Sequence, residues 1–149
     1  MNRGCPTCPA PATLGDVVYD TGMLIALATP GNSQARLRHA EYCATGRPVV
    51  PAPVVAQAWR GGPKTAHLAR ALKDCAVVCC YTETEWRRIG ELIGKAGLAS
   101  KKKPDPVDGL VTLTAVEIEA AIIATSDPED IQAYLDQIPG TEAITVLAV

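Results

Sequence analysis

Val17-Val18-Tyr19-Asp20-Thr21-Gly22 is an apolar run that stops abruptly at an acid. Its length and its apolar residues predict a short buried strand that ends just before Asp20, and Leu24 begins a helix beyond it. In an open parallel sheet, ligands bind outside the carboxyl ends of the strands. We therefore expect Asp20 to face a site, although a strand-ending Asp also commonly serves as a helix N-cap.

The composition fits a single globular domain. The chain has 149 residues, of which 48% are hydrophobic and 20% are charged, so it is long enough to bury a sizeable core. The net charge of −2 gives no overall attraction to nucleic acid. A polyanionic partner would therefore need a local basic patch or bound metal ions.

The sequence shows neither a membrane span nor a secretion signal. No stretch approaches the ~18 consecutive apolar residues that a membrane helix needs. The first residues, Met1 to Pro6, lack the apolar centre of a signal peptide. We therefore expect a cytoplasmic protein that does not contact a membrane.

Six cysteines occur, at positions 5, 8, 43, 75, 79 and 80. Cys75, Cys79 and Cys80 lie in or beside an apolar run and are expected to be buried reduced thiols. Cys5 and Cys8 have the spacing of half a zinc site, but no second Cys-x-x-Cys or His pair follows at a suitable distance. The strand-helix setting of a redox pair is missing as well. Residues 1–14 are therefore predicted to be an irregular, exposed leader, and residues 15–149 the folded domain.

Beyond the first strand, short apolar runs alternate with segments of helical period. Further strands are expected at 48–50, 75–80, 120–124 and 143–149, the last at a sheet edge, and residues 94–103 are expected to form a loop. Helices are expected to begin near residues 24, 33, 54, 63, 83, 105 and 127. This alternation predicts a three-layer α/β/α sandwich with a mostly parallel central sheet.

Four acids follow predicted strands or begin predicted helices, and so belong to one rim of that sheet: Asp20, Asp105, Asp108 and Asp127. Crowded carboxylates repel one another, and a hard cation such as Mg²⁺ or Mn²⁺ relieves the repulsion. Such a metal ion can activate a water and neutralise a leaving group on a phosphate. No Ser-His-Asp order or Gly-rich phosphate loop stands out. The chemistry best supported is that of a metal-dependent phosphodiesterase.

Helix capping is the alternative explanation of these acids. Asp105-Pro106 and Asp127-Pro128 each have the pattern of an N-cap followed by a proline in the first turn. Asp108 and Asp130 complete capping pairs, and Asp130 is interpreted as mainly structural. Capping and metal binding are compatible, because both place the carboxylate at the rim.

Four segments together resemble, in order, the acidic motifs of PIN domains, most closely those of the VapC-type toxins of toxin–antitoxin pairs: Val17–Thr21, Val50–Arg60, Asp108–Val111 and Ala124–Asp127. The resemblance covers nearly all of residues 16–149. It implies an α/β/α ribonuclease that depends on Mg²⁺ or Mn²⁺. It further implies a homodimer that a partner antitoxin inhibits.

Carried over by position, the resemblance implies that Asp20, Asp108 and Asp127 are the metal-binding catalytic carboxylates. Gln57 stands where the second motif ordinarily supplies a Glu. An amide can orient a water or coordinate a metal, but it brings no negative charge and cannot act as a base. Asp105 lies one helical turn before Asp108 and could restore the missing charge.

Basic residues beside these motifs are candidates for RNA binding. Lys101, Lys102 and Lys103 precede the Asp105 helix and could contact phosphates, although such a run is commonly a solvated loop. Arg60 belongs to the second motif and could face the substrate. Its alternative role is that of a cation in the last turn of a helix, where a positive charge is favoured.

Two functions stay open on the sequence. The first is a metal-dependent endoribonuclease, and the second is a catalytically weak module that binds RNA or a partner protein without cutting, which Gln57 favours. A phosphatase with Asp20 as a covalent nucleophile is a poorer candidate. That mechanism requires a second acid two residues after the nucleophile, and this chain has Gly22 at that position.

Overall fold

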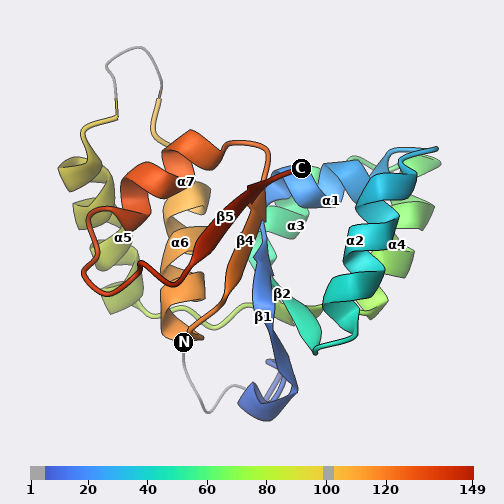
Figure 1. Cartoon of the computed structure of the whole chain (residues 1–149), viewed down its shortest axis with the longest axis horizontal. Helices are drawn as coiled ribbons and strands as arrows, with labels where there is room; N and C mark the ends of the chain where they lie inside the picture. The colour runs from blue at the N-terminus through green and yellow to red at the C-terminus, as the bar shows by residue number, and fades with distance from the viewer. Residues whose placement is uncertain (1–5, 99–102) are drawn as a thin grey trace.

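The computed structural model describes residues 6–98 and 103–149 and shows a five-stranded, all-parallel sheet with helices on both faces (Figure 1). The predicted α/β/α sandwich is confirmed. The strand order is β3-β2-β1-β4-β5. The strands are β1 (Leu14–Tyr19), β2 (Arg47–Pro51), β3 (Ala76–Val78), β4 (Ile122–Thr125) and β5 (Thr145–Ala148). The first strand is therefore central, and the last lies at an edge as expected.

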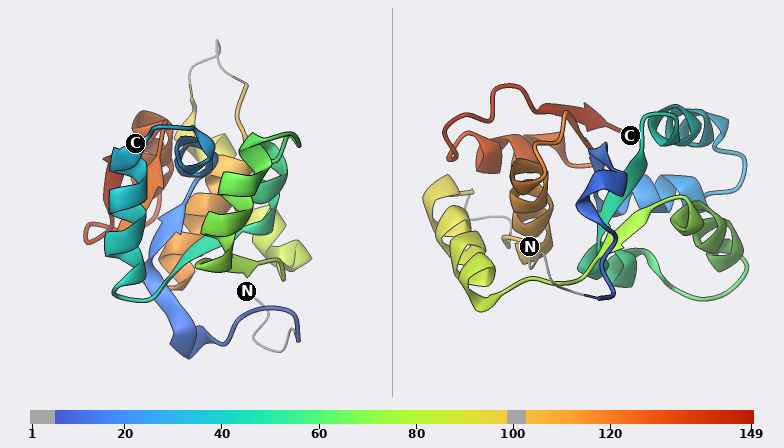
Figure 2. Two further views of the ribbon diagram at one scale, coloured as in Figure 1. Left: turned by 90° about the vertical axis from the view of Figure 1, so that its right-hand side faces the viewer. Right: turned by 90° about the horizontal axis from the view of Figure 1, so that it is seen from below.

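Helices α1 to α4 lie on one side of the sheet and α5 to α7 on the other (Figures 1 and 2). Their bounds are α1 (Thr21–Ala28), α2 (Ser33–Cys43), α3 (Ala52–Ala58), α4 (Lys64–Lys73), α5 (Glu83–Ala96), α6 (Pro106–Glu117) and α7 (Pro128–Leu135). A 3₁₀ turn at Pro11–Thr13 precedes β1. None of the helices in the two described ranges has the length and apolar character needed to cross a membrane.

The ends of several helices follow from local chemistry. Asn32 caps α2 by accepting a hydrogen bond from the Ala35 amide, and Thr82 and Glu85 form a reciprocal capping box at α5. The expected loop from residue 94 begins later than predicted, because α5 continues through Ala96. It stops at Gly97, whose φ of 54° is the left-handed conformation that glycine adopts readily.

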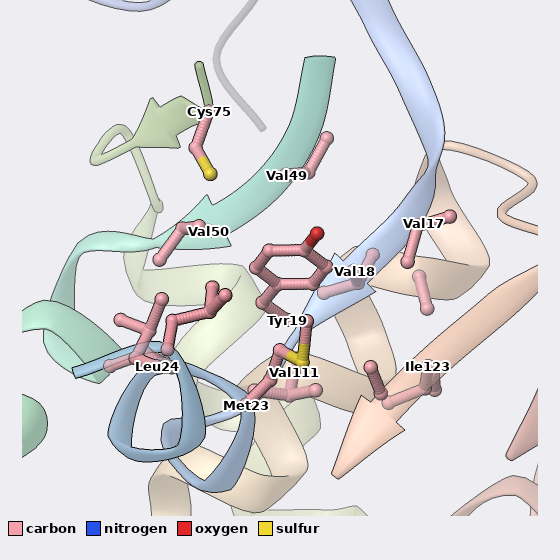
Figure 3. Close-up of a cluster of buried hydrophobic side chains, with 14 of the residues drawn as sticks. Val17, Val18, Tyr19, Met23, Leu24, Val49, Val50, Cys75, Val111 and Ile123 are labelled. Atoms are coloured by element: carbon pink, nitrogen blue, oxygen red, sulfur yellow. The ribbon is translucent and has the colours of Figure 1, made fainter. Parts of the chain in front are cut away.

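The core surrounds the central strand (Figure 3). All three residues that end β1 are fully buried, and residues of β2, α1 and α6 pack around them. The Tyr19 hydroxyl reaches His39 Nδ1 at 2.9 Å, so its polar end is satisfied. Burial of this apolar surface is the main stabilising term. It also holds the carboxyl end of β1, and with it Asp20, in a fixed place.

Candidate functional site

Asp20 lies at the carboxyl edge of the sheet, directly after β1. Its backbone N–H donates to the carbonyl of Ala124 in the neighbouring strand β4 (3.0 Å). Its Oδ1 accepts a hydrogen bond from the Thr21 N–H (2.6 Å), which makes Asp20 the N-cap of α1. Its Oδ2 accepts a hydrogen bond from the Thr125 hydroxyl (2.7 Å). The same carboxylate therefore caps a helix and belongs to the rim.

Thr125 connects Asp20 to Asp127. This threonine is fully buried at the end of β4, and its Oγ1 accepts a hydrogen bond from the Asp127 N–H (3.0 Å) while it donates to Asp20. Asp127 occupies the N-cap position of α7, but its side chain makes no capping hydrogen bond there. Capping therefore does not explain this carboxylate. Sequence reasoning missed Thr125 as a site residue, although it lies inside the fourth motif.

Gly22 allows α1 to approach the loop that follows β4. A Cβ at this position would lie 2.6 Å from the Ser126 backbone nitrogen, closer than side-chain atoms tolerate. Only a residue without a side chain fits between the two segments. The glycine therefore brings the N-terminus of α1, with Asp20, against the segment that carries Asp127.

Gln57 joins two helix N-termini across the site. Its Nε2 donates a hydrogen bond to Asp105 Oδ2 (2.9 Å), and its Oε1 accepts one from the Thr21 hydroxyl. Asp105 also caps α6, because its Oδ1 accepts from the Val107 N–H (2.8 Å). The capping prediction for Asp105 is confirmed. Its carboxylate also lies directly beside the position where the PIN motif would supply a Glu.

Asp108 lies in the first turn of α6 and is the most perturbed acid of the site. Burial, followed by the nearby charges of Asp20, Asp105, Asp130 and Asp127, raises the pKa of Asp108 to about 7. Among the described residues, none donates a hydrogen bond to its carboxylate. Ionisation of Asp108 is thus opposed by its surroundings. Asp130, interpreted from sequence as mainly structural, contributes to this electrostatic environment.

The pKa of Asp20 is raised as well, and burial is the largest cause. Hydrogen bonds from Thr125 and Thr21 partly offset that effect, whereas the charges of Asp105 and Asp127 add to it. Carboxylates perturb one another in this way only when they are close in a poorly solvated place. The acids predicted to share one rim therefore do gather there.

The donor set fits a hydrated hard cation. Asp20, Asp108 and Asp127 offer carboxylate oxygens, the ligands that Mg²⁺ and Mn²⁺ prefer. Among the described residues, no three acids bring one oxygen each within 4.8 Å of one another. Mg²⁺ usually keeps several waters and takes one or two carboxylates directly. An open arrangement of acids thus suits an ion that retains part of its hydration shell.

The basic candidates lie at the border of this site. Arg60 is exposed and lies two residues beyond the end of α3, not in its last turn as the alternative expected, because the helix already ends at Ala58. Its guanidinium donates hydrogen bonds to the Ala56 and Trp59 carbonyls (3.1 Å each). Together with Gln57 it lines a pocket of about 240 Å³. Lys103 is exposed two residues before Asp105. Lys101 and Lys102 lie outside the described residues.

The cysteine predictions were only partly right. Cys75 is buried with a free thiol, as expected. Cys79 is free but exposed, and Cys80 is disulfide-bonded. The reason is that β3 ends at Val78, so the two residues after it leave the sheet. Cys8 is partly buried and contacts Cys79, contrary to the expected exposed tail. Cys5 lies outside the described residues.

Comparison of the chain with protein-family models, curated proteins and solved structures found no match. The likeness to PIN domains therefore rests on the four motifs quoted above, and the function that they imply is a proposal.

Proposed function

We propose that this protein is a metal-dependent endoribonuclease of the PIN-domain type, similar to VapC toxins. The observation that carries the proposal is the gathering of acids at the carboxyl edge of a parallel sheet, where burial and then the charges of neighbouring acids raise the pKa values of Asp20 and Asp108. Among the described residues, no lysine or arginine forms an ion pair with Asp20, Asp105 or Asp108. Negative charge without such compensation favours a bound cation.

The described side chains have distinct roles in this proposal. Asp20, Asp108 and Asp127 would hold Mg²⁺ or Mn²⁺, which when bound supplies an activated water and neutralises charge on a phosphodiester. Thr125 orients the Asp20 carboxylate through its hydroxyl. Asp108, with a pKa of about 7, is partly protonated at neutral pH in the metal-free protein. Binding of a cation would therefore release a proton from Asp108 and would strengthen as pH rises.

RNA is the proposed substrate, and this choice over other phosphodiesters comes from the likeness to VapC toxins. Arg60 and Lys103 are exposed beside the acids and can contact phosphates electrostatically. The proposed location is the cytoplasm. A homodimer and an inhibitory antitoxin belong to the same proposal. Exposed apolar side chains available for such contacts include Leu37 (63% exposed) and Ile25 (51% exposed).

The second candidate function, a module that binds RNA or a protein without cleavage, is favoured by one observation. The Gln57 amide donates to Asp105 and thereby stabilises that carboxylate without a metal ion. A site stabilised in this way needs a cation less than one with a Glu at the same position. The two candidates differ in whether the wild-type chain cuts RNA.

Cleavage of an RNA pool in Mg²⁺, in Mn²⁺ and in chelator tests the proposal. Wild-type protein should cut RNA only with metal present, and Asp20→Asn and Asp108→Asn should abolish cleavage. Asp16→Asn is the matched control, because Asp16 is an exposed acid within β1, the strand that leads to Asp20. Binding of Mn²⁺ and RNA without any cleavage would favour the second candidate. Undiminished cleavage by Asp20→Asn would contradict the nuclease proposal.

A further inference from the structure

Three cysteines from two distant segments of the chain lie together: Cys8, which precedes β1, and the adjacent pair Cys79 and Cys80, which follows β3. Cys8 Sγ lies 3.6 Å from Cys79 Sγ, and Cys79 Sγ lies 3.9 Å from Cys80 Sγ. All three sulfur atoms lie within 4.8 Å of one another. Among the described residues, this is the one group of three potential ligand side chains that is so close together.

The surroundings of these sulfur atoms favour a thiolate. The Cys79 N–H donates a hydrogen bond to Cys8 Sγ (3.4 Å), and the Thr7 hydroxyl lies 3.5 Å from Cys79 Sγ. The thiolate is the form of cysteine that binds metals.

We propose that Cys8, Cys79 and Cys80, when reduced, bind a soft divalent metal ion, for which Zn²⁺ is the natural probe. With a Zn–S bond of about 2.3 Å, two sulfur ligands of a tetrahedral zinc ion lie about 3.8 Å apart. The separations of 3.6 Å and 3.9 Å in this cluster are close to that value. Three thiolates would leave a fourth position for a further ligand.

The three-cysteine metal site cannot form while Cys80 is in its disulfide. Cys80 is disulfide-bonded in the structure, and a disulfide sulfur is not a thiolate ligand. A dithiol reductant supplies two electrons and two protons and converts the disulfide into two thiols. The metal ion then binds as the cysteine thiols lose their protons. Metal binding therefore requires the reduced protein.

The cysteine cluster and the acids at the sheet edge favour different metal ions. Thiolates select soft ions such as Zn²⁺, whereas carboxylates select Mg²⁺ and Mn²⁺. A bound ion would tie Cys8, which precedes β1, to Cys79, which follows β3. Because the ion binds the folded protein, it should raise the temperature of unfolding.

The test is a Co²⁺ titration of the reduced, metal-free full-length chain, followed by displacement with Zn²⁺. Co²⁺ should give the intense charge-transfer and visible bands of a tetrahedral thiolate complex, and Zn²⁺ should remove them. Cys8→Ser and Cys79→Ser should weaken binding at least about tenfold. Cys43→Ser is the matched control, because Cys43 is also a free, partly buried thiol but lies outside the cluster.

Two further measurements serve as controls for this titration. Oxidised protein should give no thiolate bands, and circular dichroism shows whether each variant is folded. If a serine variant fails to fold, the Zn²⁺-dependent rise in unfolding temperature of reduced wild type, absent from oxidised wild type, carries the test. Absence of thiolate bands in reduced wild type would overturn the proposal. So would equal Co²⁺ binding by reduced and oxidised protein, or by folded Cys79→Ser.

Discussion

The side-chain amide of Gln57 donates a 2.9 Å hydrogen bond to the carboxylate of Asp105, which joins α3 to the N-terminus of α6. The amide N–H satisfies one oxygen of the Asp105 carboxylate. A glutamate at position 57 would offer only acceptors when ionised and would face Asp105 with a second negative charge. The identity of residue 57 therefore sets how strongly the site depends on a cation.

Gln57→Glu should destabilise the metal-free protein and strengthen metal binding. The lost hydrogen bond and the added repulsion should lower the free energy of unfolding by about 1–3 kcal/mol above neutral pH. Added Mn²⁺ should restore most of that stability and raise any RNA cleavage. Thermal unfolding with and without Mn²⁺ measures the effect.

A matched control exists on α7. The Gln132 amide donates a 2.8 Å hydrogen bond to Asp136, but both side chains are exposed and solvent screens their charges. Gln132→Glu should change stability by less than about 0.5 kcal/mol and should show no Mn²⁺ dependence. Equal effects of the two substitutions would mean that Gln57 has no special role.

Asp108→Asn should stabilise the metal-free protein, because the native carboxylate is buried among other acids. The pKa of Asp108 is about 7 in the folded protein against an ordinary value of 3.8, so the folded state holds a proton that the unfolded state loses. This lowers the stability of the wild type as pH rises from about 4 to 7. The variant should therefore gain about 1–2 kcal/mol at pH 8, once solvent screening is allowed for.

Chemical denaturation of both proteins across this pH range measures the difference. The advantage of Asp108→Asn should be absent near pH 4, should grow up to about pH 7 and should then level off. His39, whose pKa is lowered chiefly by burial, titrates equally in both proteins and cancels from the comparison. A variant that is less stable than wild type at pH 8 would show that Asp108 is a structural residue of the helix.

Thr125→Val should loosen the Asp20 carboxylate without removing its charge. The substitution deletes both the donor to Asp20 and the acceptor for the Asp127 N–H. Unsatisfied buried groups cost about 1–3 kcal/mol, and Mn²⁺ affinity should fall less than in Asp20→Asn. Thr125→Ser keeps the hydroxyl and should recover the Mn²⁺ affinity. Wild-type Mn²⁺ affinity in Thr125→Val would contradict the role assigned to the hydroxyl.

Gly22→Ala should disrupt the contact between α1 and the loop after β4. The added Cβ would lie 2.6 Å from the Ser126 nitrogen, so either backbone must shift. We expect a loss of about 1–3 kcal/mol in thermal or chemical unfolding, together with weaker Mn²⁺ binding. Gly90→Ala is the control, since a Cβ at this α5 position meets nothing within 4 Å and alanine favours helix. That variant should be as stable as wild type or more so.

The fold could be predicted well because the sequence patterns that indicate its strands and helices are local. An apolar run that ends at Asp20, the capping box at Thr82 and the alternation of strands with helices all depend on near neighbours in the chain. The end of α5 was less predictable. Gly94 usually disfavours a helix, yet a Cβ there would meet nothing within 4 Å, and the helix continues past it to Ala96.

The candidate site was predicted in part. The convergence of Asp20, Asp108 and Asp127 follows from strand-end geometry and could be read from the sequence. The links made by Thr125 and Gln57 could not, because they depend on hydrogen bonds between residues distant along the chain. The contact of Cys8 with Cys79 was missed for the same reason.

The most direct measurement is a calorimetric titration of the metal-free protein with Mn²⁺, on wild type, Asp20→Asn and Asp16→Asn. The proposed acidic metal site predicts that wild type and Asp16→Asn bind Mn²⁺ equally. Asp20→Asn should bind it at least about tenfold more weakly. Absence of binding to wild type at millimolar Mn²⁺, or equal affinity in Asp20→Asn, would contradict the metal site and with it the proposed chemistry.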